Sequence, residues 1–237
     1  MNRQINIAEE FDTLVRNLGG TLVRDILGDS PKISNADYLF PSAKVVAELK
    51  CLQDDKLEDP VLMEEMENLW GKWREQGVVK GDIPNVILGN SIPPKCYREL
   101  YSLCAKPLKG IIKKANRQVR ETRKGLGLHD HHGLLLLAND GNFAMPPKTL
   151  LTIVGKILQH ASGEIEDFVI FAGNMLVGIP GVDRPCYFWL PGWTSRGPQV
   201  SPQFVRQLGV AWKAHHESVT REKFKEFGDS MEKRFSI

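Results

Sequence analysis

Two carboxylates and one lysine within residues 35–52 have the types and spacing needed to bind a cation. The segment, NADYLFPSAKVVAELKCL, reads as a β-hairpin. In its simplest register, Asp37 on the first arm faces Glu48 on the second. Carboxylates that face each other across two strands destabilise the pair unless a positive charge lies near them. Lys50, on the same face as Glu48, can supply that charge, and a divalent metal ion is the alternative.

The alternation of residue types predicts how this hairpin is buried. The first arm is expected at 37–40, the turn at 41–44 and the second arm at 45–52. Because side chains alternate between the two faces of a strand, one face of the second arm is wholly apolar and carries Val45, Ala47, Leu49 and Cys51. The second arm is therefore expected inside a sheet, with its charged residues on the opposite face.

Two predicted helices flank the hairpin, and each offers it one polar group. Residues 5–18 carry an apolar stripe along one helical face, and Glu10 lies at the border of that stripe. A long helix is expected from about 95 to 124, in which Pro107 permits a break or kink. Gln118 falls on the buried face of its second half. Both polar side chains are therefore candidates for the same site.

The second half of that long helix is strongly basic. Residues 106–124 contain eight lysines and arginines against one glutamate, a local net charge of +7 in a chain whose total is +2. A solvated helix face is one interpretation, and a surface that contacts phosphates is the other. If the surface binds nucleic acid, the contacts are expected from Lys109, Lys113, Lys114, Arg117 and Arg120.

The remaining apolar segments predict an α/β fold. Short apolar runs predict further strands at 133–138, 168–171 and 186–190. Amphipathic segments predict a helix at 146–160 and a C-terminal helical region at about 202–235. No internal repeat or clear linker divides the chain, so a single α/β domain over residues 1–237 is the simplest organisation.

Composition narrows the class of protein. The small net charge means that any surface for a polyanion must be local. Four cysteines without CxxC spacing favour reduced, mostly buried thiols over disulfides or a zinc site. The first residues lack the apolar core of a signal peptide, and no run approaches the roughly 18 apolar residues of a membrane span. We expect a cytoplasmic protein with no membrane partner.

Together these residues resemble the PD-(D/E)xK nuclease superfamily, which has the restriction-endonuclease-like fold. Its core order, α-β-β-β-α-β, can be laid on residues 5 to about 138, with the first strand falling in 21–27, a segment that also fits a helical turn. The resemblance implies a mixed central sheet flanked by helices. Two departures are Ala36, which stands where the motif has proline, and a large helical insertion at about 53–107.

The resemblance also implies roles for individual residues. Asp37 would be the motif aspartate, Glu48-Leu49-Lys50 the E-x-K element, Glu10 the first-helix carboxylate and Gln118 the polar residue of the crossing helix. Mg²⁺, for which Mn²⁺ can substitute, would be held by Asp37, Glu48, the Leu49 carbonyl and, through water, Glu10. Lys50 would orient the attacking water or stabilise the developing charge, and Gln118 would position water or a phosphate.

The expected activity is thus Mg²⁺-dependent hydrolysis of DNA phosphodiester bonds, serving defence against foreign DNA or DNA processing. The first alternative is an inactive nuclease-like fold that binds nucleic acid or acts as an assembly subunit, with the insertion at 53–107 contacting partner proteins. The second is a protein-binding module in which Asp37, Glu48 and Lys50 form a cross-strand ion pair. A homodimer is compatible with the resemblance, since many such nucleases cut duplexes with two active sites. The residues themselves do not distinguish DNA from RNA.

Overall fold

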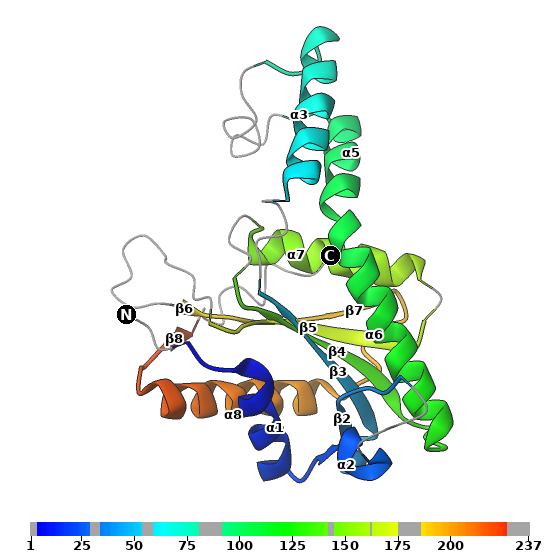
Figure 1. Ribbon diagram of the computed structural model, residues 1–237, viewed down its shortest axis with the longest axis vertical. Coiled ribbons are helices and arrows are strands. Elements are labelled where there is room, and N and C mark those ends of the chain that lie inside the picture. Colours follow the sequence, from blue (N-terminus) through cyan, green and yellow to red (C-terminus); the bar gives the residue numbers. More distant parts are fainter. Residues whose placement is uncertain are drawn as a thin grey trace.

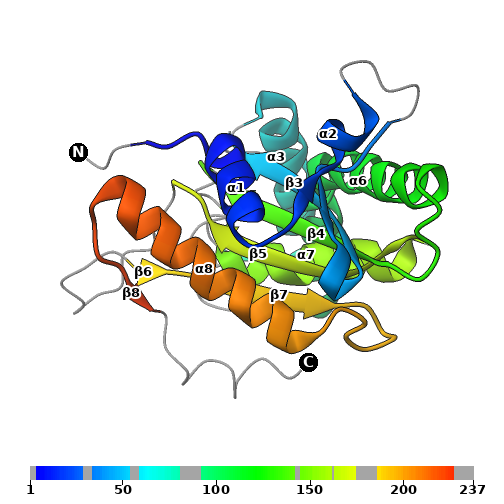
Figure 2. The same ribbon diagram turned by 90° about the horizontal axis from the view of Figure 1, so that it is seen from below.

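A six-stranded mixed sheet with helices on both faces forms the centre of the molecule (Figures 1 and 2). The computed structural model describes residues 4–28, 34–53, 59–80, 92–141, 145–161, 163–174 and 186–226. The predicted α/β class, with a mixed sheet flanked by helices, is confirmed. No helix in these ranges is long and apolar enough to cross a lipid bilayer.

The strand order in the main sheet is β1-β2-β3-β4-β5-β7. These strands are β1 (Thr21–Leu22), β2 (Tyr38–Phe40), β3 (Val45–Leu52), β4 (His132–Asn139), β5 (Ile165–Ala172) and β7 (Trp189–Trp193). The three central strands β3, β4 and β5 run parallel to one another, whereas β1, β2 and β7 pair antiparallel with their neighbours. Parallel strands covered on both sides favour continuous apolar runs, and β4 is such a run.

Helices cover the sheet in two layers. The helices are α1 (Ile7–Asn17), α2 (Val23–Leu27), α3 (Pro60–Glu75), α5 (Pro94–Cys104), α6 (Lys106–Gly125), α7 (Pro147–His160) and α8 (Pro202–Thr220). In both views α1 and α8 lie on one face of the sheet, and α6 and α7 lie on the other (Figures 1 and 2). On the α1 face, the rings of Phe11 and Tyr38 stack with centroids 5.5 Å apart, and Trp212 of α8 lies 5.1 Å from Phe11.

A pair of helices, α3 and α5, projects from this body (Figure 1). The indole of Trp73 donates a hydrogen bond to Glu99 at 3.1 Å and so ties the two helices together. The long helix expected from about 95 to 124 is divided at Ala105, two residues before Pro107, into α5 and α6. The break is thus where the sequence permits it, because proline removes one helical hydrogen bond.

Two C-terminal elements differ from expectation. The run at 186–190 was predicted as one strand, but Cys186–Tyr187 forms β6 in a second, two-stranded sheet with β8 (Lys225–Glu226), and β7 begins only at Trp189. α8 ends at Thr220, earlier than the expected region 202–235, and β8 follows it. Arg221 has a φ of 59°, which ends the helix. Residues 227–235 lie outside the described residues.

The segment 21–27, which fits either a strand or a helical turn, contains both. Thr21 and Leu22 pair with β2, and the next five residues form the short helix α2. The amide of Val23 still donates to the carbonyl of Asp37 at 2.9 Å, so the start of α2 remains attached to the strand. This link holds the N-terminal part of the chain against the hairpin.

Candidate functional site

The β2–β3 hairpin has the register that the sequence predicts. Phe40 pairs with Val45 and Tyr38 with Ala47, so the next residues along, Asp37 and Glu48, come opposite each other. A short 3₁₀ turn joins the strands, and its last residue, Lys44, has a φ of 53°. With β2 on one side and β4 on the other, β3 is an interior strand, as expected.

Glu48 is the most deeply buried charged group of the hairpin. Its side chain is 0% exposed, and Oε1 forms an ion pair with the ammonium of Lys50. The other oxygen, Oε2, is buried and receives no hydrogen bond from any described residue. Lys50 is 20% exposed, so the ion pair reaches from the interior toward solvent. A buried carboxylate oxygen without a donor is costly, and a cation or a shared proton would satisfy it.

Asp37 is held against the centre of the E-x-K element. Its Oδ2 accepts a hydrogen bond of 2.8 Å from the backbone amide of Leu49. The register places Asp37 opposite Glu48, and the negative charge of Asp37 contributes to raising the pKa of Glu48. The hairpin therefore brings both carboxyl groups together, next to Lys50, in an environment that is largely closed to water.

Burial dominates the electrostatics of this pair. Burial, with a smaller contribution from the negative charge of Asp37, raises the pKa of Glu48 to about 8, while Lys50 acts in the opposite direction. Burial also raises the pKa of Asp37, against the lowering effect of the hydrogen bond from Leu49. Two carboxyl groups whose charged forms are both disfavoured gain from a nearby divalent cation, which favours both charged forms.

The carbonyl of Leu49 points toward the same edge as Asp37. The carbonyls of Lys44 and Leu52 accept hydrogen bonds from the β4 side, through His132 at 2.8 Å and Asp140 at 3.0 Å. Backbone groups along a strand alternate between its two edges, so odd-numbered residues of β3 face β2. β2 begins at Tyr38, which pairs with Ala47. No residue of β2 therefore pairs with Leu49 at this edge of β3.

Helix α6 fixes the loop that leads into Asp37. Thr122 Oγ1 accepts a 2.7 Å hydrogen bond from the amide of Ala36, and Gln118 Nε2 donates at 2.8 Å to the carbonyl of Asn35. Gln118 Oε1 is buried and has no hydrogen-bond partner among the described residues. Gln118 therefore lies beside the hairpin, at the border of the buried side of α6 and not within it, with one acceptor unused.

Glu48 and Gln118 lie on the same side of the sheet. Tyr38, paired with Ala47, packs on Phe11 of α1, so that face of β3 belongs to α1. Glu48 alternates with Ala47 and therefore points to the opposite face, which α6 covers. In the described structure, two unused buried acceptors, from Glu48 and Gln118, thus lie on the side of the sheet that α6 covers.

Two acids of α1, Glu10 and Asp12, have different partners in the structure. Glu10 Oε2 lies 2.7 Å from His215 Nε2 of α8, so it is paired away from the hairpin. The charge of Asp12, by contrast, contributes to raising the pKa of Asp37, and Asp12 is also ion-paired with Arg24. Both acids border the apolar stripe of α1, and no signal in the sequence tells which border faces β2.

The site contains a pair of carboxylates, not a full set of side-chain ligands. In the described ranges, no group of three or more His, Cys, Asp or Glu side chains could hold a metal ion. Mg²⁺ in proteins is commonly bound by one or two carboxylates together with waters and substrate phosphates. Asp37, Glu48 and the Leu49 carbonyl match that limited donor set.

The five cations expected to contact nucleic acid all lie on the exposed side of α6. Lys109, Lys113, Lys114, Arg117 and Arg120 are exposed, and none forms an ion pair with a described residue. Two further cations of the helix, Lys106 and Arg123, are in contrast paired with Glu65 and Glu164. The structure therefore leaves the five predicted side chains available to an external anion.

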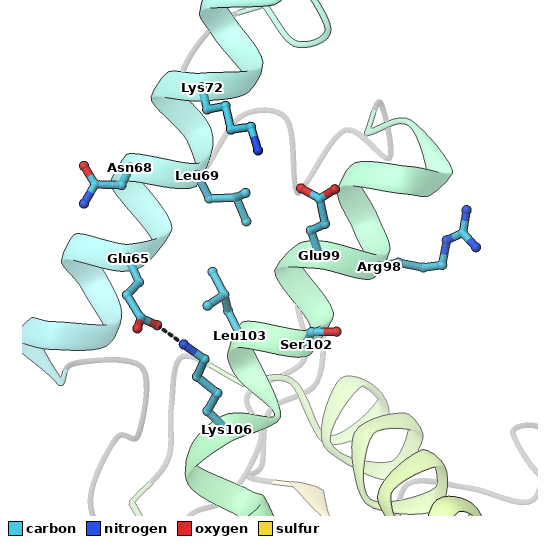
Figure 3. Close-up of a pocket in the computed structure, with 9 residues that line it drawn as sticks. All are labelled: Glu65, Asn68, Leu69, Lys72, Arg98, Glu99, Ser102, Leu103 and Lys106. Atoms are coloured by element: carbon cyan, nitrogen blue, oxygen red, sulfur yellow. Dashed lines mark hydrogen bonds and ion pairs between the residues drawn. The ribbon is translucent and has the colours of Figure 1, made fainter.

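A groove lies between α3 and α5 (Figure 3). Its volume is about 610 Å³, and Glu65 and Lys106 close one end with an ion pair of 2.6 Å. None of the carboxylates of the hairpin lines it. The projecting helices thus carry a separate surface, within the segment predicted as an insertion at 53–107.

Comparison of the chain with protein-family models, with curated proteins and with solved structures returned no match. The functional conclusion therefore depends on the geometry of the site.

Proposed function

We propose that this protein is a metal-dependent nuclease that hydrolyses phosphodiester bonds of DNA, within a PD-(D/E)xK, restriction-endonuclease-like core. The observation that carries the proposal is the fully buried Glu48, which faces Asp37, contacts Lys50 and keeps one oxygen without a donor. A buried pair of carboxyl groups next to a lysine is expensive to maintain, so a role that requires it explains its presence better than packing does.

The order of elements also supports the proposal. α1, β1, β2, β3, α6 and β4 follow the α-β-β-β-α-β order that the resemblance implies, apart from the short α2 and the projecting helices. β3 carries Glu48 and Lys50, and α6 carries Gln118 on the face toward them. The agreement covers the order of elements and the positions of Asp37, Glu48, Lys50 and Gln118, whereas Glu10 is paired with His215.

In the proposed reaction, Asp37, Glu48 and the Leu49 carbonyl would hold Mg²⁺ or Mn²⁺, and the negative charge of Asp12 would add to the attraction for the cation. The bound metal would lower the pKa of a coordinated water and offset charge on the phosphate. Lys50 is paired with Glu48 in the free protein, and it would donate to the attacking water or a phosphoryl oxygen once Glu48 has another cationic partner.

Gln118 has a positioning role in this scheme. Its amide nitrogen is already engaged by Asn35, which leaves Oε1 as an acceptor of fixed orientation for a water hydrogen. An amide does not titrate, so this contact would not change with pH.

A cleavage panel tests the proposal. Single-stranded DNA, double-stranded DNA, modified DNA and RNA are incubated with the protein in Mg²⁺ or in EDTA, beside the Lys50→Ala variant. Cleavage of DNA in Mg²⁺, its loss in EDTA and a large decrease in the variant are expected. A parental rate in Lys50→Ala would contradict the assignment, and a preference for RNA would change the substrate.

A non-catalytic nucleic-acid-binding protein is the second candidate. The ion pair between Lys50 and Glu48 and the limited set of carboxylates are both compatible with a site that no longer binds metal. Salt-sensitive DNA binding that is independent of metal, without cleavage of any substrate in the panel, would favour this function.

A further inference from the structure

A stripe of cations runs along the side of α6 that faces away from the sheet. Lys109, Lys113, Arg117, Arg120 and Lys124 recur every three or four residues, and all five are exposed. An α-helix has 3.6 residues per turn and rises about 1.5 Å per residue, so these side chains form one line roughly 22 Å long. We refer to these five residues as the α6 stripe.

The opposite side of α6 is committed to the core. Leu108, Ile112, Ala115 and Val119 are fully or almost fully buried, and they lie roughly half a helical turn away from the α6 stripe. Gln118, which faces the hairpin, lies between these two sides. The α6 stripe is therefore exposed to solvent. It lies on a different side of α6 from the side that faces Asp37 and Glu48.

The acidic residues of these helices are held away from the α6 stripe. Residues 94–125 contain ten lysines and arginines and only two glutamates, a net charge of +8 that leaves −6 on the rest of the chain. Glu99 accepts a hydrogen bond from Trp73 of α3, and Glu121 accepts one from the amide of Ser34 at 3.0 Å. Neither carboxylate is directed toward the α6 stripe. The positive charge of the α6 stripe is therefore not offset by an acidic residue of its own helices.

The positive surface continues from α6 onto α5. Lys95 and Arg98 are exposed and lie opposite the buried side of α5, which carries Cys96, Leu100 and Cys104. α5 leads directly into α6 (Figure 1), and Arg98 points away from α3 (Figure 3). Cations thus occur from the projecting helices to the end of α6.

We infer that the α6 stripe is a track for a polynucleotide backbone, separate from the carboxylate site. A duplex carries one phosphate per about 3.4 Å of axis on each strand, so roughly 22 Å of cations spans about six phosphates of one strand. A bilayer fits less well, because a helix that binds a membrane surface inserts its apolar side, and that side of α6 is buried.

This inference deepens the proposed function and rests on it for the identity of the polymer. The α6 stripe and the hairpin lie on different sides of α6. The α6 stripe would therefore contact a part of the polymer other than the phosphodiester bond that is cut. Affinity is therefore expected to increase with the length of the nucleic acid until the α6 stripe is covered.

Binding measured in EDTA separates this inference from cleavage. Fluorescence anisotropy with a labelled duplex compares the parent, the Lys113→Ala/Arg117→Ala variant and the control Arg196→Ala/Arg206→Ala, which removes two exposed cations outside α5 and α6. Each neutralised phosphate contributes about −0.9 to the slope of log K against log salt, so removing two stripe cations should reduce the slope by about 1.8. The affinity should fall at least tenfold, with little change in the control.

Equal loss in the two double variants would overturn the inference, as would stripe-dependent binding to anionic phospholipid vesicles without binding to duplex. A parent that shows stripe-dependent binding but never cleaves in Mg²⁺ would contradict the nuclease and leave the track supported. The Lys113→Ala/Arg117→Ala variant could also bind with unchanged affinity and cleave long and short duplexes at the parental rate. That result would contradict the role of the α6 stripe and leave the proposed nuclease supported.

Discussion

The carboxylate of Asp37 accepts a hydrogen bond from the backbone amide of Leu49 at 2.8 Å. This bond connects the residue before β2 to the residue that separates Glu48 from Lys50 on β3. Glu48 and Lys50 are only two positions apart and share one face of the strand. The hairpin therefore holds three ionisable groups in one unit, and α6 fixes the loop from which Asp37 comes.

Thr122 is predicted to be the main anchor of that loop. Replacing it with valine leaves the buried amide of Ala36 without its 2.7 Å acceptor, which should cost about 1–3 kcal/mol of stability. Thr122→Ser keeps the hydroxyl and should cost less. Chemical denaturation of both variants measures the difference. Equal destabilisation by serine and valine would show that the methyl group contributes as much as the hydrogen bond, which would contradict the prediction.

Asp12 is predicted to contribute more to the site than Glu10. Asp12→Asn should weaken metal affinity about tenfold, as expected for a group that supports a metal site without binding the metal directly, whereas Glu10→Gln should change it little. Because Asp12 is paired with Arg24, Arg24→Gln serves as the control for loss of that ion pair. Calorimetric titration with Mn²⁺ provides the measurement. A larger effect from Glu10→Gln would restore the first-helix assignment made from the sequence.

Divalent metal is predicted to stabilise the folded protein through the carboxylate pair. A ligand at about 100 times its Kd stabilises the native state by about 2.7 kcal/mol, so the melting temperature should rise with Mg²⁺ or Mn²⁺. Glu48→Gln removes one of the two carboxylates and should abolish most of the rise. A similar increase in the parent and in this variant would place any bound metal elsewhere in the molecule.

His216 is predicted to make the fold sensitive to acid. Burial and the charge of His215 lower the pKa of His216 to about 4, from an ordinary value of 6.5. A lowered histidine pKa means that the unfolded chain binds the proton more readily, so stability is complete above pH 6.5 and falls as the pH drops toward 4. The two pKa values imply a loss of about 3 kcal/mol.

His216→Phe should flatten this pH dependence. A phenylalanine ring can occupy the same place between Trp212 and Phe224, whose centroids lie 5.6 and 4.9 Å from the histidine. Urea denaturation at pH 7 and pH 4.5 compares parent and variant. An unchanged difference between the two pH values would show that another group is responsible.

The part of the site within the hairpin could be predicted because its determinants are local. Alternation along β3 and the short turn after Phe40 set the register, which brings Asp37 opposite Glu48. Gln118 could be placed because helical periodicity separates the buried side of α6 from its cationic side. In each case the relevant period is contained within a few residues of one element.

Features that depend on distant contacts could not be predicted in this way. Glu10 and Asp12 border the same apolar stripe, and the contact of Glu10 with His215 spans 205 residues. The apolar run at 186–190 is likewise divided because Cys186 pairs with Lys225, whereas Trp189 pairs with Phe171 of β5. Local patterns contain no information about such partners, so they indicate the type of element but not its place in the fold.

The rate of a single round of DNA cleavage in Mg²⁺, measured for the parent and for Asp37→Asn, tests the central claim most directly. Both proteins must first give the same melting temperature in EDTA, so that a lower rate reflects the site and not the fold. The variant keeps the shape of the side chain but loses the charge. Removal of one charge-stabilising group commonly costs 10²–10³ in rate, so a decrease of about 100-fold or more is expected. A folded Asp37→Asn protein that cleaves at the parental rate would contradict the account.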